Sequence, residues 1–284
     1  MAISADFRED FGVVSQATIE KLEPKEGLFV LHLFYRFEAG EAAAGETPKV
    51  LLGALEALLA EARESDRSQA ATLSLIGRAD LGFLFLSPDL FRLHRWEKRL
   101  GALLGRHGGK KVFSFFSMTE RSDYTTSEEE HGDQLASQDG LVPGSPEFEE
   151  KMKAFRERMR HYTEVRLYPT LPDWRFFAFY PMNKKRETGA NWYALPFPER
   201  KELMQGHSLV GRRYAGRVIQ YVTGSTGLDD WEWGVTLFAH DPYEIKSIVA
   251  EMRFDPVSAH YGEFGPFFTG LQMPPVAILA PLGV

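Results

Sequence analysis

GFLFLSP at residues 82–88 and GVTLF at residues 234–238, the second followed shortly by Pro242, are the stretches from which the fold can be worked out. Each is a run of apolar, aromatic and β-branched residues, which is typical of a buried strand. In each case a proline then stands where a helical pattern begins, and proline is favoured in the first turn of a helix. The repetition predicts that the two halves of the chain share one supersecondary unit.

The elements around these stretches follow the same order in both halves. In the first half we predict strands at 28–37, 71–77, 82–86 and 111–118, with helices at 48–63 and from Pro88 to about Gly101. In the second half we predict strands at 174–180, 216–223, 233–238 and 267–271, with helices at 198–207 and from Pro242 through Met252. A repeated β-α-β-β-α-β order is the ferredoxin-like pattern. We therefore predict an α+β fold whose two sheets pack face to face or close into a barrel.

An acidic segment divides the chain. Residues 122–146 are rich in Ser, Gly, Asp and Glu and have no apolar period, which predicts a flexible linker or loop acting as a lid. An insertion without a role is an equal alternative. The predicted units are an N-terminal ferredoxin-like repeat at 1–121 and a C-terminal repeat at 147–284.

The composition excludes several classes of function. A net charge of −7 leaves no basic excess to neutralise phosphates, which argues against nucleic acid as a partner. With no cysteine, the chain can form no disulfide, thiolate-ligated iron or cysteine zinc site. Residues 1–10 lack the apolar core of a signal peptide, and no stretch approaches the ~20 apolar residues that span a bilayer. We therefore expect a soluble, cytoplasmic protein.

Histidine is the residue type that offers an iron ligand here. The sequence has no GxGxxG, P-loop, HExxH or GxSxG motif, and its eight histidines lack metal-ligand spacing. A single axial histidine to a porphyrin needs no such spacing. His207 is the candidate, because it follows Leu203 by four residues and shares the apolar face of the predicted helix. On spacing alone, a packed or capping histidine is the commoner interpretation.

Other polar residues of the second half could face a ligand. Gln220 lies between Val218 and Val222 on one strand face, where a ligand or the backbone could pair with its amide. Tyr180 ends a strand and precedes three cations, which suits a carboxylate-bearing ligand beside an oxidisable ring. A strand-end aromatic and a solvated turn are the alternatives. The arginines able to clamp carboxylates, each by default a surface residue, are Arg166, Arg212, Arg213 and Arg253.

The second half resembles the chlorite dismutase-like superfamily, and within it the coproheme decarboxylases of the monoderm type. The first half follows that family only in the order of its elements. The resemblance implies two ferredoxin-like repeats in a dimeric α/β barrel, commonly assembled as a homopentamer, with a porphyrin in the C-terminal repeat. The matching segments are 180–186 (YPMNKKR), 191–193 (NWY), 199–200, 203–204, His207, 211–212 and, the longest, 224–268.

The resemblance also implies a role for individual residues. His207 matches the proximal ligand of the iron, and Gln220 matches the distal residue above it. Tyr180 matches the tyrosine thought to carry the radical that attacks a propionate, and Lys184 matches the lysine associated with the second decarboxylation. The other positions expected around the porphyrin and its propionates are Arg166, Pro181, Met182, Asn183, Trp192 and Ser258.

The residue at the distal position separates the activities of this superfamily. Where Gln220 stands, chlorite dismutases have an arginine and actinobacterial decarboxylases have a histidine base. The resemblance therefore implies hydrogen-peroxide-dependent oxidative decarboxylation of Fe-coproporphyrin III (coproheme), which is both substrate and cofactor. The product is heme b, formed through a three-propionate species in the last step of a heme biosynthesis, and a coproporphyrin ferrochelatase is the expected transient supplier. The alternatives are a heme peroxidase or chlorite-dismutase-like enzyme, and a non-catalytic heme carrier or sensor.

Two features depart from the family pattern. Ser208 stands where the family has a glycine after the proximal histidine, which could alter a turn and the orientation of the ligand. The acidic segment 122–146 is also longer than expected at a place where family members have a mobile loop.

Overall fold

The structure of the chain is a computed structural model that describes residues 21–37, 48–64 and 66–282. The expectation that residues 1–10 form no signal peptide lies outside the described residues, as do the first 20 residues of the predicted N-terminal unit. Among the described residues, no helix is both long and apolar enough to cross a membrane.

The first half forms the predicted ferredoxin-like unit. Its elements are β1 (Phe29–Phe37), α1 (Pro48–Glu64), β2 (Gln69–Ile76), β3 (Leu81–Ser87), α2 (Leu90–Gly105) and β4 (Gly109–Thr119), with the antiparallel order β2-β3-β1-β4. The predicted elements are confirmed, with small shifts at their ends. α2 begins after Pro88 because the carboxylate of Asp89 caps it, accepting a hydrogen bond from the Phe91 amide at 3.0 Å.

The second half repeats the unit. Its elements are β5 (Phe176–Lys184), α5 (Phe197–Arg212), β8 (Val218–Gly224), β9 (Trp233–Ala239), α6 (Pro242–Met252) and β11 (Phe268–Gln272), with the order β8-β9-β5-β11. Six further elements were not predicted, namely β6 (Arg186–Glu187), β7 (Ala190–Asn191), the 3₁₀ turn η2 (Trp192–Ala194), α7 (Pro256–Tyr261), β10 (Gly262–Phe264) and α8 (Pro275–Leu282). These elements are short, and period-based reading of a sequence detects short elements poorly.

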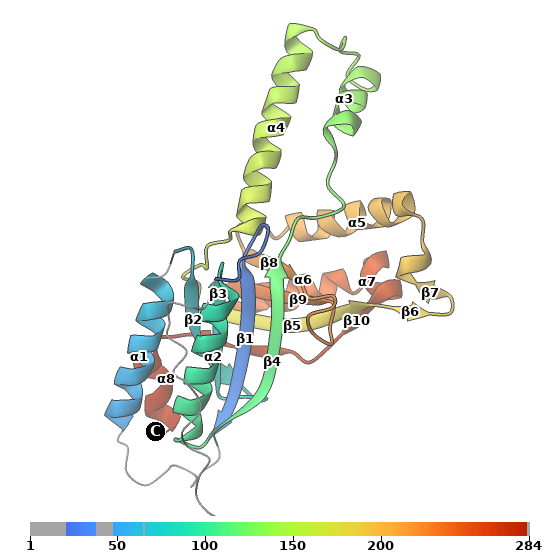
Figure 1. Ribbon diagram of the computed structural model, residues 1–284. Helices are drawn as coiled ribbons and strands as arrows, with labels where there is room; N and C mark the ends of the chain where they lie inside the picture. The colour runs from blue at the N-terminus through green and yellow to red at the C-terminus, as the bar shows by residue number, and fades with distance from the viewer. Residues whose placement is uncertain (1–20, 38–47, 65, 283–284) are drawn as a thin grey trace, which may run out of the picture.

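The two sheets close into a barrel, one of the two predicted arrangements. β4 pairs with β8, beside it in Figure 1, β2 pairs with β11, and β5 pairs with β9. The strands of both repeats therefore form one continuous antiparallel ring. Closure leaves no repeat with an open edge at these joints. The barrel interior is filled mainly by phenylalanines, including Phe34, Phe115, Phe177, Phe179 and Phe238, none of which is exposed.

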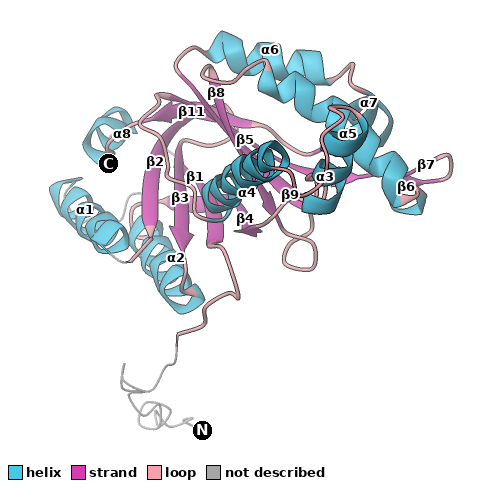
Figure 2. Cartoon of the chain, turned by 90° about the horizontal axis from the view of Figure 1, so that it is seen from above, coloured by secondary structure: helices cyan, strands magenta, loops and turns pink. Residues whose placement is uncertain are grey.

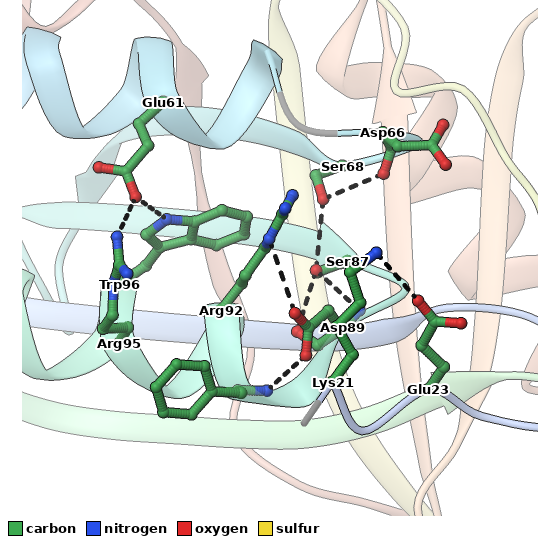
Figure 3. A network of polar contacts seen from close by, with 11 residues as sticks. Lys21, Glu23, Glu61, Asp66, Ser68, Ser87, Asp89, Arg92, Arg95 and Trp96 are labelled. Atoms are coloured by element: carbon green, nitrogen blue, oxygen red, sulfur yellow. Dashed lines mark hydrogen bonds and ion pairs between the residues drawn. The ribbon is translucent and has the colours of Figure 1, made fainter. Parts of the chain in front are cut away.

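The helices cover the barrel on two sides. α1, α2 and α8 lie against the N-terminal repeat, and α5, α6 and α7 lie on the other side (Figure 2). On the N-terminal side, Glu61 of α1 accepts hydrogen bonds from Arg95 and from the indole of Trp96 on α2, at 2.8 and 3.2 Å (Figure 3). Buried leucines beneath this network, such as Leu51 and Leu55, complete a close-packed layer.

The acidic segment between the repeats contains a helix, which corrects the expectation of a linker without regular structure. α3 (Glu128–Ser137) begins with a capping box, in which Ser127 and Glu130 bond to each other's backbone amides. A second unpredicted helix, α4 (Pro146–Leu167), follows at once and projects from the barrel beside α3 (Figure 1). The two pack through His131 and Phe155, whose rings stack at 4.2 Å, and through buried Leu135. The apolar contacts of α3 and α4 are few, so their period is weak in the sequence.

Candidate functional site

The outer face of the C-terminal sheet presents rows of side chains that are set by strand register. One row contains Tyr180, Val235 and Val222, which are paired directly across β5, β9 and β8. The neighbouring rows are Ala178, Leu237 and Gln220 on one side, and Met182, Trp233 and Gly224 on the other. Since residues opposite each other in an antiparallel pair share a face, Tyr180, Met182 and Gln220 all face the same way.

His207 lies on α5 and is held by a buried carboxylate. Its Nδ1 is 2.8 Å from Oδ2 of Asp255, whose side chain is only 2% exposed. A carboxylate can only accept a hydrogen bond, so Nδ1 carries the hydrogen, and Nε2 is the ring nitrogen left for a ligand. Metal-ligating histidines are commonly oriented in this way by a carboxylate on the other nitrogen.

Asp255 is positioned by the start of α7. The same Oδ2 accepts a hydrogen bond from the Ser258 amide at 3.1 Å, so Asp255 is the N-cap of that helix. Ser258 therefore lies one turn from the carboxylate that holds His207. Asp255 is a residue that we missed in the sequence; the only local signal for it was a helix cap, Asp255 before Pro256, which says nothing of a histidine 48 residues away.

α5 runs five residues further than predicted, so His207 lies within the helix rather than at its end. Ser208 therefore also lies inside the helix. Its hydroxyl donates to the Gln205 carbonyl at 2.8 Å, and the predicted change of a turn after His207 does not occur. None of the residues of α5 is buried, and Leu209 is 58% exposed. The helix contacts α6 and α7, yet none of its side chains is buried in the core of the chain.

Lys184 is buried at the end of β5, which extends four residues beyond the predicted strand. Its ammonium lies 4.7 Å from the ring centroid of Trp192, itself 2% exposed, in a cation–π arrangement. Burial lowers the pKa of Lys184 to about 8, while the carboxylates of Asp255 and Glu232 raise it. The alternative that Lys184 belongs to a solvated turn is therefore wrong.

Tyr180 is a buried phenol on the same strand. Its ring stacks on Phe267 at 4.5 Å, and Phe264 lies 5.8 Å away. Burial raises the pKa of Tyr180 to about 12, with a smaller opposing effect from Arg253. The phenol therefore keeps its hydrogen at any ordinary pH, and the interpretation of a strand-end hydroxyl in water does not hold.

Gln220 is an exposed residue of β8, so the alternative of a backbone-bonded core glutamine is wrong. No hydrogen bond joins its amide to another side chain within the described part of the chain. Gln220 lies in the row next to that of Tyr180, so its amide faces the side of the sheet on which α5 and α6 lie. A neutral amide can donate and accept there, but it cannot act as a base.

Arg166 lies at the end of α4, away from the His207–Asp255 pair. Its Nε donates to the Glu120 carbonyl at 3.0 Å, and the Glu120 carboxylate accepts a hydrogen bond from the Trp233 indole at 3.2 Å. Burial raises the pKa of Glu120, and the Trp233 hydrogen bond opposes this. Because Trp233 shares a row with Met182, Glu120 and Trp233 link Arg166 to the sheet face.

Pro181 and Asn183 are not brought together with the other predicted residues. Strand alternation turns both away from the face that Tyr180, Met182 and Lys184 share. The Pro181 carbonyl accepts from the Gly265 amide, and Oδ1 of Asn183 accepts from the Glu232 amide, each at 2.8 Å. Both residues brace the end of β5.

Of the other arginines proposed as carboxylate clamps, Arg253 lies nearest the site, with its guanidinium 4.2 Å from the ring centroid of Phe264. Arg213 pairs with Glu251, and Arg212 donates to Ser208 at 2.9 Å. Arg212 and Arg213 are exposed and already paired with residues of α5 and α6. Of these three arginines, Arg253 therefore stays the candidate for binding a carboxylate.

The donor set fits one axial bond to a porphyrin iron. Nε2 of His207 is a single nitrogen donor with an ordered partner on the opposite ring nitrogen, which is what a five-coordinate heme needs from its protein. Within the described residues, no group of three or more His, Cys, Asp or Glu side chains could hold a metal ion by itself.

Comparisons with known proteins show which family the chain resembles in sequence and in fold. The chlorite dismutase family model matches residues 49–273. A coproheme decarboxylase of Thermus thermophilus is 39% identical over 91% of this chain and 95% of its own length. A relative from Natronomonas pharaonis, described as a heme-binding protein, is 38% identical over 88% of this chain, which spans only 40% of that relative's length. A solved heme-binding protein, also from Thermus thermophilus, superposes with a TM-score of 0.74, at 36% identity, over 94% of this chain and 99% of that one.

The predicted α+β fold, with two ferredoxin-like repeats closed into a barrel, is thus confirmed by the strand pairing and by the family model alike. The family model covers well over half of the chain, and the Thermus relative is similar along almost its entire length. The chain belongs to the chlorite dismutase family.

Proposed function

We propose that this protein is a coproheme decarboxylase, which uses hydrogen peroxide to convert coproheme to heme b through a three-propionate species. Each step removes one carboxylate: a propionate, hydrogen peroxide and one proton become a vinyl group, carbon dioxide and two waters. The Thermus relative with this name, 39% identical over most of both chains, supports the assignment.

The observation that carries the proposal is the state of Tyr180. It is 6% exposed, its ring stacks on Phe267, and burial raises its pKa to about 12, so the phenol is held protonated inside the protein. A protonated phenol can give up an electron and a proton and then take a hydrogen atom from a propionate carbon. The iron of the bound substrate supplies the oxidation by peroxide, and His207 is the residue that would hold it.

Gln220 favours decarboxylation over chlorite chemistry. It shares the face of Tyr180 and is one row away, so a porphyrin held by His207 against this face would have Gln220 among its neighbours. Its amide carries no charge to hold an anionic oxidant and no basic site to deprotonate peroxide. Lys184, Arg253 and Arg166 are the cations that we assign to the propionates, with Met182, Trp192 and Ser258 around the ring.

The test is an anaerobic titration of the purified protein with coproheme, followed by stepwise addition of hydrogen peroxide and mass analysis of the porphyrin. We expect loss of two carboxyl groups in sequence, with the three-propionate species between them. Binding without loss of mass would overturn the decarboxylase assignment and leave a heme peroxidase, carrier or sensor.

We further propose, on the family resemblance alone, that the protein forms a homopentamer in the cytoplasm and receives coproheme from a coproporphyrin ferrochelatase. The division into repeats at 1–121 and 147–284, with the segment 122–146 as a mobile cover of the propionates, is part of the same proposal. Sedimentation of the purified protein tests the subunit number.

A further inference from the structure

Glu232 lies just before β9 and bonds to the end of β5 and to β6, on either side of Lys184. It is 5% exposed, and Oε2 of its carboxylate accepts a hydrogen bond from the backbone amide of Lys184 at 2.8 Å. Oε1 is 2.9 Å from a guanidinium nitrogen of Arg186 on β6. Its own amide donates to Asn183 at 2.8 Å, so Glu232 is bonded to residues on both sides of Lys184 and fixes the end of β5.

The indole on which the Lys184 ammonium rests is held by the adjoining residue of the chain. The Trp192 amide donates to the Lys185 carbonyl at 3.0 Å, and the Lys184 ammonium lies over the Trp192 ring. Burial and the Glu232 carboxylate both raise the pKa of Tyr193, the neighbour of Trp192 in the 3₁₀ turn. Glu232 therefore fixes the backbone of Lys184 directly, and Lys185 holds the indole beneath its ammonium.

The charges around Lys184 come from several elements. Burial lowers the pKa of Lys184, and two carboxylates raise it: Asp255 at the start of α7, which also bonds to His207 on α5, and Glu232 from the segment before β9. Arg186 on β6 is paired with Glu232 and neutralises part of its charge. Removing either carboxylate should therefore lower the pKa of the Lys184 ammonium.

We propose that Glu232 is the positioning residue for Lys184 in the second decarboxylation. This inference rests on the proposed function, in which Lys184 acts on the three-propionate species. Glu232 touches no reacting atom; it sets the place and the charge of the ammonium that binds the propionate left for the second step. The first decarboxylation, carried by Tyr180, does not require it.

The direct test is Glu232→Gln, with Asp230→Asn as the matched control. Asp230 is an acid of the same segment, so the control removes the same charge without removing a contact to Lys184. A glutamine can still accept from the Lys184 amide, but its NH₂ group then opposes the Arg186 donor. We expect Glu232→Gln to slow the second step about tenfold or more, so that the three-propionate species accumulates, with the first step within about twofold. Asp230→Asn should leave both steps unchanged.

The pH profile separates positioning from a loss of structure. The ammonium is present below the pKa of Lys184, about 8, and is lost above it. Glu232→Gln removes a charge that raises this pKa, so the second step should fail at lower pH than in the wild type. Arg186→Gln removes an exposed cation, 63% accessible, and should move the same limit to higher pH. This second variant is expected to fold whatever becomes of the first.

A double variant completes the test. If Glu232 acts through Lys184, adding Glu232→Gln to Lys184→Ala should slow the second step no further. Equal slowing of both steps by Glu232→Gln, an unmoved pH limit in both single variants, or a further additive loss in the double variant would overturn the inference. Failure of the wild-type protein to convert coproheme would instead overturn the proposed function.

Discussion

Asp255 accepts hydrogen bonds from the His207 ring and from the Ser258 amide with a single carboxylate oxygen. It therefore couples the orientation of the proposed iron ligand to the start of α7. Removing its charge should affect the ligand more than the helix, because an asparagine is as good an N-cap as an aspartate.

Asp255→Asn is accordingly expected to weaken coproheme binding by about tenfold or more while the protein stays folded. Asp241→Asn is the control, since Asp241 caps α6 in the same way, accepting from the Tyr243 amide at 2.8 Å, without a histidine partner. Spectrophotometric titration measures both affinities. Equal affinities in the two variants would show that Asp255 is only a helix cap.

Tyr180→Phe is expected to bind coproheme with unchanged affinity and to form no vinyl group. The reason is that phenylalanine keeps the stacking on Phe267 but has no hydroxyl hydrogen to lose. Tyr221→Phe is the matched control, because Tyr221 on β8, which β9 separates from β5, donates to the Thr170 carbonyl at 2.7 Å on the opposite face of the sheet. Mass analysis after peroxide addition decides the outcome, and normal turnover by Tyr180→Phe would contradict the radical role.

At the scale of elements, the first helix of each repeat has a different environment. α1 buries Leu51, Leu55, Leu58 and Leu59 against its sheet, whereas α5 buries none of its residues. Among the described residues of the N-terminal repeat, the side chains of α1 and α2 cover the outer face of the sheet. The C-terminal repeat keeps that face for the residues around Tyr180.

The capping box of α3 gives a prediction at this scale. Ser127→Ala should destabilise α3 locally by about 1 kcal/mol, because the amide of Glu130 loses its acceptor. Amides of α3 should then exchange about fivefold faster, while the global Tm stays unchanged, since Leu135 is the one buried residue of that helix. Ser137→Ala, at the far end of α3, is the control. Equal exchange in both variants would show that α3 is held by its contacts with α4 and α5 instead.

At the scale of the whole molecule, a buried histidine links strands of the two repeats through the interior of the barrel. Nε2 of His32 on β1 is 2.9 Å from Oγ1 of Thr236 on β9, 204 residues later, and its ring stacks on Phe179 at 4.1 Å. Burial lowers the pKa of His32 to about 3. The folded state therefore holds this ring neutral, whereas the unfolded chain protonates it near its ordinary pKa of ~6.5.

The sign of the pH dependence follows from these two values. Between pH ~6.5 and pH 3 the unfolded state binds the extra proton, so the free energy of unfolding falls with falling pH, by at most ~1.4 kcal/mol per pH unit. His32→Phe should be less stable at neutral pH but should lose less stability on acidification than the wild type. His240→Gln, at an exposed position, should keep the wild-type slope. Denaturant unfolding at several pH values measures the slopes, and identical slopes in all three proteins would refute the assignment.

Much of the fold could be predicted because its signals are local. The apolar runs of strands such as β3 and β9 and the leucine period of α1 depend only on near neighbours in sequence, so the repeated unit was predicted correctly. The helices α3 and α4 were missed because they bury only Leu135, Met152, Phe155 and Leu167 and thus show little period. Among the site residues, Tyr180 was proposed from its position at a strand end, and the other residues of the 180–186 segment were proposed from the family resemblance. Asp255 and Glu232 were not proposed, since their partners lie 48 residues away.

The amino-acid order therefore determines two β-α-β-β-α-β units and the residue types placed along β5, α5 and β8, because strand and helix periods are properties of short segments. Tertiary structure decides the rest: that the sheets close through β4–β8, β2–β11 and β5–β9, that α5 stays unburied, and that Asp255 meets His207 while Glu232 meets Lys184. Each of these depends on the register between segments far apart in the chain. That register is set by the packing of the whole barrel rather than by any one segment.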